Sequence, residues 1–213
     1  MAHPIYKTSD GKRVPSVTTV LGKFKDPGGL LYWAWNEGME GRDFRQTREE
    51  AADAGTVAHE MVEAYLLKRD PDLAGFSPEV LEKGSAAFDN YLRWAEHSDL
   101  EVVATETSMV SESMRTGGTP DAIGVVNGEL CVLDWKTSKS IYPEYLVQVA
   151  AYGAIWDENN PKDPITGGYH ILRFDRDHGD FSHSYYRDLS SALEMFEHLR
   201  RCYDLVAELK KRA

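Results

Sequence analysis

Two apolar runs in the middle of the chain flank the dipeptide Asn127-Gly128. Asn-Gly between such runs is the strongest short-range signal for a β-hairpin with a two-residue type I′ turn. The turn sets the register of the two strands, and counting outward from it places Asp121 opposite Asp134. Because both faces of this hairpin are apolar, we expect other elements to cover it on each side.

The rest of the pattern predicts helices before and after this hairpin. Hydroxyl residues from Ser16 onward are typical of a helix start, and Thr47 with Glu50 forms a capping box that opens a helix to about residue 68. Ser77 followed by Pro78 opens another helix. We expect further helices at 30–37, 143–156 and 189–211, strands at 102–110, 168–174 and 181–186, and a short opening hairpin around residues 10 and 11. This order predicts an α/β fold with a mixed central sheet flanked by helices.

The charge of the chain is unevenly distributed. The 213 residues predict a single domain, 1–213, with a formal net charge of −11. Residues 1–48 hold eight Lys or Arg against five Asp or Glu, and the remainder holds 16 against 30. The acidic excess argues against a broad electrostatic grip on nucleic acid, and a solvated acidic surface explains most of it. A relatively basic N-terminal helical segment, 1–48, is still available for phosphates.

The sequence contains no apolar run of membrane-spanning length and no basic-then-apolar secretory pattern. We therefore expect a cytoplasmic protein without a membrane partner. Its two cysteines are too few for a four-cysteine iron–sulfur cluster. Cys131 falls within the hairpin strand, where a small buried thiol is expected.

Asp121 and Asp134 are the first candidates for chemistry. Like charges directly across a ladder destabilise it, so two facing carboxylates among apolar neighbours indicate a bound cation. Alternation along the strand points Lys136 to the same side and Trp135 to the other. A lysine beside a cation indicates catalysis, although two solvated hairpin aspartates would show the same spacing.

Pro120-Asp121, twelve intervening residues, and Asp134-Trp135-Lys136 resemble the PD-(D/E)XK nuclease motif. Gly55-x-x-x-His59 ahead of it resembles the first motif of RecB-type nucleases, and Gln148-x-x-x-Tyr152 after it resembles the last. Residues 15–21 are similar to the opening of stand-alone members such as phage exonucleases and the mitochondrial genome maintenance exonuclease. The matching segments span residues 15–152 in the family's order.

The resemblance implies a restriction-endonuclease-like α/β core and a set of site residues. His59, Asp121, Asp134 and the Trp135 carbonyl would bind one or two Mg²⁺ or Mn²⁺ ions. Lys136 would position or deprotonate the attacking water. Glu106, on the preceding strand, would support a second ion or the water shell. Gln148 and Tyr152 would align the substrate strand.

Other residues are candidates for holding nucleic acid. Unpaired bases often stack on aromatic side chains, and three aromatics within four residues cannot all face one direction on a helix. These aromatics are Tyr32, Trp33 and Trp35, for each of which core packing is the favoured alternative. Arg42, Arg45, Arg48 and Lys139 would contact phosphates. We expect His170, Arg173, His178 and His183 to be surface residues.

The resulting hypothesis is a stand-alone, divalent-metal-dependent DNA exonuclease acting on single strands or frayed ends. The chain lacks a Walker phosphate loop, so no ATP is implied. Recombination, repair or phage DNA metabolism fits such an enzyme, with a phage-encoded protein acting in a bacterial host and a recombination protein as a candidate partner. An endonuclease on the same core and a non-catalytic binding module are the alternatives. Cleavage polarity and the choice between DNA and RNA stay open.

Overall fold

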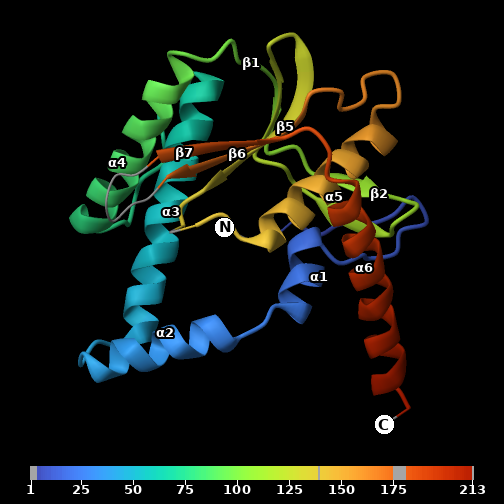
Figure 1. Ribbon diagram of the computed structural model, residues 1–213, viewed down its shortest axis with the longest axis horizontal. Coiled ribbons are helices and arrows are strands. Elements are labelled where there is room, and N and C mark those ends of the chain that lie inside the picture. Colours follow the sequence, from blue (N-terminus) through green and yellow to red (C-terminus); the bar gives the residue numbers. More distant parts are fainter. Residues whose placement is uncertain (1–3, 139, 175–180, 213) are drawn as a thin grey trace.

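The computed structural model describes residues 4–138, 140–174 and 181–212, with the backbone alone at 49–52. Its elements are shown in Figure 1. The helices are α1 (Val17–Phe24), α2 (Gly28–Met39), α3 (Phe44–Leu67), α4 (Pro78–Ala95), α5 (Pro143–Asn159) and α6 (Ser190–Lys210). The strands are β1 (Glu101–Thr105), β2 (Met109–Ser111), β3 (Thr116–Gly118), β4 (Ala122–Val126), β5 (Glu129–Lys136), β6 (Gly168–Phe174) and β7 (Phe181–Tyr186).

Five strands form one mixed sheet in the order β1-β4-β5-β6-β7. The β4–β5 hairpin pairs Val126 with Glu129 and continues to Ala122 with Leu133, so the register predicted from the Asn-Gly turn is confirmed. β5 and β6 run parallel because α5 connects them as a crossover, and the other pairs are antiparallel. The predicted fold class, a mixed sheet flanked by helices, is confirmed.

Each face of the sheet has its own apolar core. On one face, α1, α5 and α6 pack against residues that include Ile123 and Val132. On the other face, α3 and α4 pack against Leu133 and Trp135, with Tyr91 at the centre. Figure 1 shows the two helix groups on opposite sides of the strands. Two cores hold β5 in place from both sides, which fixes the end of the strand that carries the candidate chemistry.

The strand predicted at 102–110 is divided in the structure. β1 ends at Thr105, and Glu106 adopts a left-handed backbone with φ of 45°. After it, β2 leaves the main sheet and pairs with β3. The backbone N–H of Glu106 donates to the Asp121 carbonyl at 3.2 Å, so the break places the two residues side by side.

Capping side chains account for the starts of α1, α3 and α4. The side chains of Ser16 and Ser77 accept from the backbone N–H groups of Thr19 and Val80, as their sequences predict. The prediction that α3 starts at Thr47 is wrong, because Asp43 supplies an earlier cap and the helix begins at Phe44.

The second predicted hairpin is confirmed as β6 and β7, while its connection at 175–180, with His178, lies outside the described residues. The surface prediction for His170 is wrong. Its side chain is buried, and its Nδ1 lies 2.8 Å from Nε2 of His183. Burial lowers the pKa of His170 to about 4, and the neighbouring His183 adds to this. None of the helices in the part of the chain that the structure describes is long and apolar enough to cross a bilayer.

Candidate metal centre

Three ligand-bearing side chains meet beside the end of β5. One ligand atom each from His59 on α3, Glu106 after β1 and Asp121 before β4 lie within 4.8 Å of one another. Among the described residues, this is the one group of three or more such side chains with that spacing. The fold therefore gathers residues that are up to 62 positions apart in the sequence (121 minus 59).

His59 is held between a carbonyl and a carboxylate. Its Nε2 lies 3.0 Å from the Trp135 carbonyl oxygen, and its Nδ1 lies 3.7 Å from Oδ1 of Asp121. In a neutral imidazole that donates from Nε2, Nδ1 carries a lone pair. That lone pair then faces Oδ1 of Asp121, which is also an acceptor. A cation between the two atoms would bind both of them.

Asp121 is anchored by the strand next to it. Its Oδ2 accepts a hydrogen bond of 2.7 Å from the backbone N–H of Trp135. This contact leaves Oδ1 directed toward His59. The register of the hairpin therefore places Asp121 opposite Asp134. It also lets one carboxylate oxygen of Asp121 accept a hydrogen bond from the backbone of β5.

Asp134 is fully buried, and neither of its carboxylate oxygens has a hydrogen-bond partner with good geometry. Its closest charge is Lys136, whose Nζ lies 2.5 Å from Oδ2. Burial raises the pKa of Asp134 to about 6, against the opposing effect of the Lys136 ammonium. Burial disfavours the charge of Lys136, but Asp134 and Asp121 outweigh it and raise the pKa of the lysine. A buried, under-satisfied carboxylate is a place where a cation fits.

Glu106 completes the acidic surroundings. Although the residue as a whole is exposed, desolvation of its carboxylate raises the pKa of Glu106 to about 8, and the charges of Asp121 and Glu63 add to the shift. Crowded carboxylates with raised pKa values are typical of metal sites and catalytic sites.

Helix α5 supplies a second group of contacts around Lys136. The Lys136 ammonium lies over the ring of Tyr145, 5.1 Å from its centroid. Gln148 donates from Nε2 to the hydroxyl of the buried Tyr152 at 3.0 Å. The sequence reasoning missed Tyr145, although its position three residues before Gln148 places it on the same helical face.

Gly55 lets α3 approach the end of β5. A Cβ at this position would lie 2.6 Å from Oγ1 of Thr137, the residue after Lys136. The space that glycine leaves is therefore taken by Thr137. Glu60, next to His59 in the sequence, is buried and accepts from Arg69 and from the backbone N–H of Asp72.

The residues predicted to hold nucleic acid lie mainly on α2 and the start of α3. Tyr32 and Trp35 are 66% and 59% exposed and stack on each other with ring centroids 6.1 Å apart. Trp33 packs edge-on against Phe44 instead. Arg45 and Arg48 are exposed. Arg42 is bound by Glu37 and Glu40, and Lys139 lies outside the described residues.

The donor set fits a hard divalent cation. Two clustered carboxylates and the buried carboxylate of Asp134 supply the oxygen ligands that Mg²⁺ and Mn²⁺ prefer, and His59 adds one imidazole nitrogen. They lie where a β-hairpin meets a parallel crossover, with the lysine on the same strand as the second aspartate. The core is a mixed sheet flanked by helices, as the resemblance implied.

Comparisons with known proteins found similar solved structures at low sequence identity. No protein-family model matches the chain, and no curated protein matches it. A protein of Eubacterium rectale described as a candidate exonuclease is similar in structure, with 13% identity and a TM-score of 0.45 over 68% of this chain and 64% of that one. The protein SSO0001 is similar over 58% of this chain and 60% of its own, with 16% identity and a TM-score of 0.33. The chain thus spans less than two thirds of either protein, and function rests on the geometry of the site.

Proposed function

We propose that the protein is a divalent-metal-dependent DNA exonuclease. The observation that carries this proposal is the juxtaposition of the His59, Glu106 and Asp121 group with the buried Asp134–Lys136 pair. Metal-dependent phosphodiester hydrolysis needs hard ligands beside a group that can handle a proton, and the site offers both. A silent binding module would gain nothing from two buried, under-satisfied carboxylate oxygens.

Each residue of the site has a proposed role that follows from its position. His59, Asp121 and Glu106 would hold the ion, and Asp134 and the Trp135 carbonyl lie next to them. A bound Mg²⁺ or Mn²⁺ would neutralise charge on the scissile phosphate and lower the pKa of a bound water. Lys136, held between Asp134 and the ring of Tyr145, would orient that water as an ammonium, because its pKa is raised.

The Gln148–Tyr152 pair lies on α5, the helix that also carries Tyr145. Tyr152 is 5% exposed, so Gln148 is the member of the pair that can reach a substrate strand. We assign this pair to the alignment of the sugar-phosphate backbone, with Gln148 in contact and Tyr152 holding it in place.

Single strands or frayed ends are the proposed substrate. The stacked, exposed rings of Tyr32 and Trp35 offer π-faces to unpaired bases. Arg45 and Arg48, at the start of α3, are exposed and would contact phosphates. We place such an enzyme in DNA recombination, repair or phage DNA metabolism.

The decisive experiment compares cleavage of single-stranded, linear double-stranded and closed circular DNA with Mg²⁺, Mn²⁺ or EDTA. Metal-dependent loss of linear but not circular DNA, with separate 5′ and 3′ labels giving the polarity, supports the exonuclease. Opening of the circle would instead establish an endonuclease. Folded Lys136→Ala protein that cleaves like the wild type would refute the role of the lysine.

A further inference from the structure

Helix α2 lies apart from the sheet and presents apolar residues to solvent. Figure 1 shows it meeting the end of α3 that is far from the strands. Leu31, Tyr32, Trp35 and Met39 are 59% to 68% exposed. A helix that is this apolar is ordinarily packed into a core. Of its twelve residues, all of which the structure describes, Glu37 alone is buried. The orientation of α2 therefore depends on something other than an apolar core.

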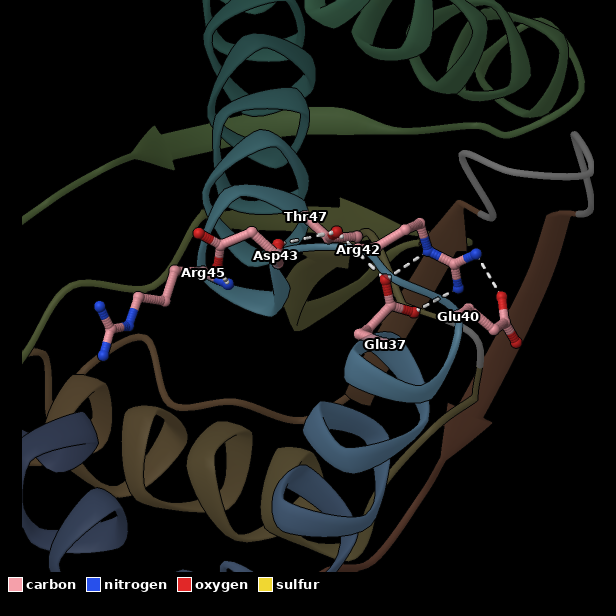
Figure 2. Close-up of polar contacts among 6 residues, drawn as sticks. All are labelled: Glu37, Glu40, Arg42, Asp43, Arg45 and Thr47. Carbon is pink, nitrogen blue, oxygen red and sulfur yellow. Dashed lines mark hydrogen bonds and ion pairs between the residues drawn. The ribbon is translucent and has the colours of Figure 1, made fainter.

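The C-terminal end of α2 is closed by a Schellman motif. Gly41, with φ of 73°, donates from its backbone N–H to the Gly38 carbonyl at 3.1 Å, and Arg42 donates to the Glu37 carbonyl at 2.9 Å. The residues at the positions of Glu37 and Arg42 usually make an apolar contact in this motif. Here they make a two-pronged ion pair, with Nε to Oε2 at 2.7 Å and Nη2 to Oε1 at 2.8 Å, as Figure 2 shows.

Helix α3 reaches the same carboxylate from the other side. Asp43 caps α3 by accepting from the backbone N–H of Arg45 at 2.9 Å. One turn later, the Thr47 hydroxyl lies 3.2 Å from Oε2 of Glu37 and 3.3 Å from the Asp43 carbonyl (Figure 2). Glu37, Arg42, Asp43 and Thr47 thus form a polar corner that joins the end of one helix to the start of the next.

The two acidic partners of Arg42 are unequal. The Glu37 side chain is 7% exposed, whereas that of Glu40, which also contacts Arg42, is 59% exposed. A largely buried carboxylate depends on its partner, while an exposed ion pair contributes little. Glu40 therefore provides a matched control for Glu37, because it has the same side chain, lies at the C-cap of the same helix and binds the same arginine.

We propose that Glu37 is a positioning residue that holds α2 in place through Arg42 and Thr47 and so sets how Tyr32 and Trp35 meet unpaired bases. The inference rests on the proposed function. Helix α3 is the rigid link, since the twelve residues from Thr47 to His59 (59 minus 47) span about 18 Å of one uninterrupted helix. A change at the corner alters the binding surface and leaves the metal centre, which two apolar cores hold, unchanged.

The test separates strand binding from chemistry. Binding of a fluorescein-labelled 20-residue oligothymidylate is measured with Ca²⁺ in place of Mg²⁺, and turnover is measured on bis(p-nitrophenyl) phosphate with Mn²⁺. We expect Glu37→Gln to weaken oligonucleotide binding by roughly tenfold, since it removes a buried charge-assisted pair, with ester turnover within about twofold of wild type. Glu40→Gln is expected to change both by less than about twofold.

If wild type, Glu37→Gln and Glu40→Gln bind the oligonucleotide equally well, the inference is overturned. If these proteins still hydrolyse the ester, the proposed nuclease function stands. A wild-type protein that neither binds the oligonucleotide nor hydrolyses the ester would overturn both. If Glu37→Gln fails to fold, Thr47→Val replaces it, because this variant keeps the ion pair and removes its hydroxyl contact. We expect a smaller loss of binding for Thr47→Val, and no loss would again contradict the inference.

Discussion

The metal centre and helix α2 are built in opposite ways. Residues of the metal centre come from distant segments and are placed by two apolar cores, with Val132 and Trp135 almost fully buried between them. Helix α2 is placed by polar contacts among residues 37–47, which are neighbours in the sequence. Chemistry thus depends on long-range packing, and the proposed grip on the strand depends on a short local motif. Substitutions should affect the two separately.

The largest effect is expected at the metal centre. Asp134→Asn removes a buried carboxylate beside the proposed ion, and we expect cleavage to fall on the order of a thousandfold. Initial rates on labelled single-stranded DNA would measure it. Asp157→Asn, a partly buried carboxylate on α5 away from the site, is the control and should keep its rate within about twofold. Cleavage by Asp134→Asn at half the wild-type rate would contradict the assignment.

Substitutions in the aromatic face of α2 should weaken strand binding and leave the chemical step unchanged. Trp35→Ala removes one ring of the stacked pair, and we expect oligonucleotide binding to weaken roughly tenfold, in line with the stacking energy of a base. Turnover of a small phosphate ester should not change. Trp35→Phe keeps a π-face and should recover most of the binding. Fluorescence anisotropy titrations would measure the binding of the oligonucleotide. Equal binding by Trp35→Ala and Trp35→Phe would refute stacking.

Substitution of Gly55, where α3 meets the end of β5, tests how strongly turnover depends on the packing between these two elements. Gly55→Ala would bring a Cβ within 2.6 Å of Thr137 Oγ1, so the Thr137 side chain must move. If that movement is passed on to the neighbouring Lys136, we expect roughly a fivefold loss of turnover. Gly22→Ala on α1, with open space at its Cβ, is the control and should stabilise the fold by about 0.5–1 kcal/mol. Unchanged kinetics for Gly55→Ala would show that the junction tolerates the shift.

The smallest effect is a pH dependence of stability. The folded-state pKa values of Asp134 and Glu106, about 6 and about 8, lie above the ordinary values of 3.8 and 4.5. The folded protein therefore binds these protons more tightly. The stability that they contribute is complete below pH 4 and is lost as pH rises through 6 and then 8.

Melting curves without metal should accordingly show a Tm that falls between pH 5 and pH 8, and less so in Asp134→Asn. Because metal binds the ionised carboxylates, Mn²⁺ should raise the Tm more at pH 8 than at pH 5. A metal effect that is equal at the two pH values would argue against these carboxylates as ligands.

Features that depend on residues close together in the chain could be predicted from the sequence. The Asn-Gly turn fixes a register within a few residues, so Asp121 and Asp134 could be placed by counting. The serine caps of α1 and α4 are local in the same sense.

Features that depend on tertiary contacts escaped the sequence analysis. Nothing in the residues around Glu106 marks the left-handed break that brings it to Asp121. The approach of Tyr145 to Lys136 requires the crossover to be packed. Similarly, Arg42 was assigned to phosphates because its pairing with Glu37 depends on how the chain turns between two helices.

The polar corner also bears on how this protein can diversify. Because α2 is attached through the polar contacts and turns of residues 37–47 and the packing of Trp33 on Phe44, its exposed residues make few demands on the rest of the molecule. Replacement or lengthening of that helix requires no repacking of either core. The surface that meets the substrate is therefore a part that selection or an engineer can exchange while the catalytic machinery is inherited unaltered.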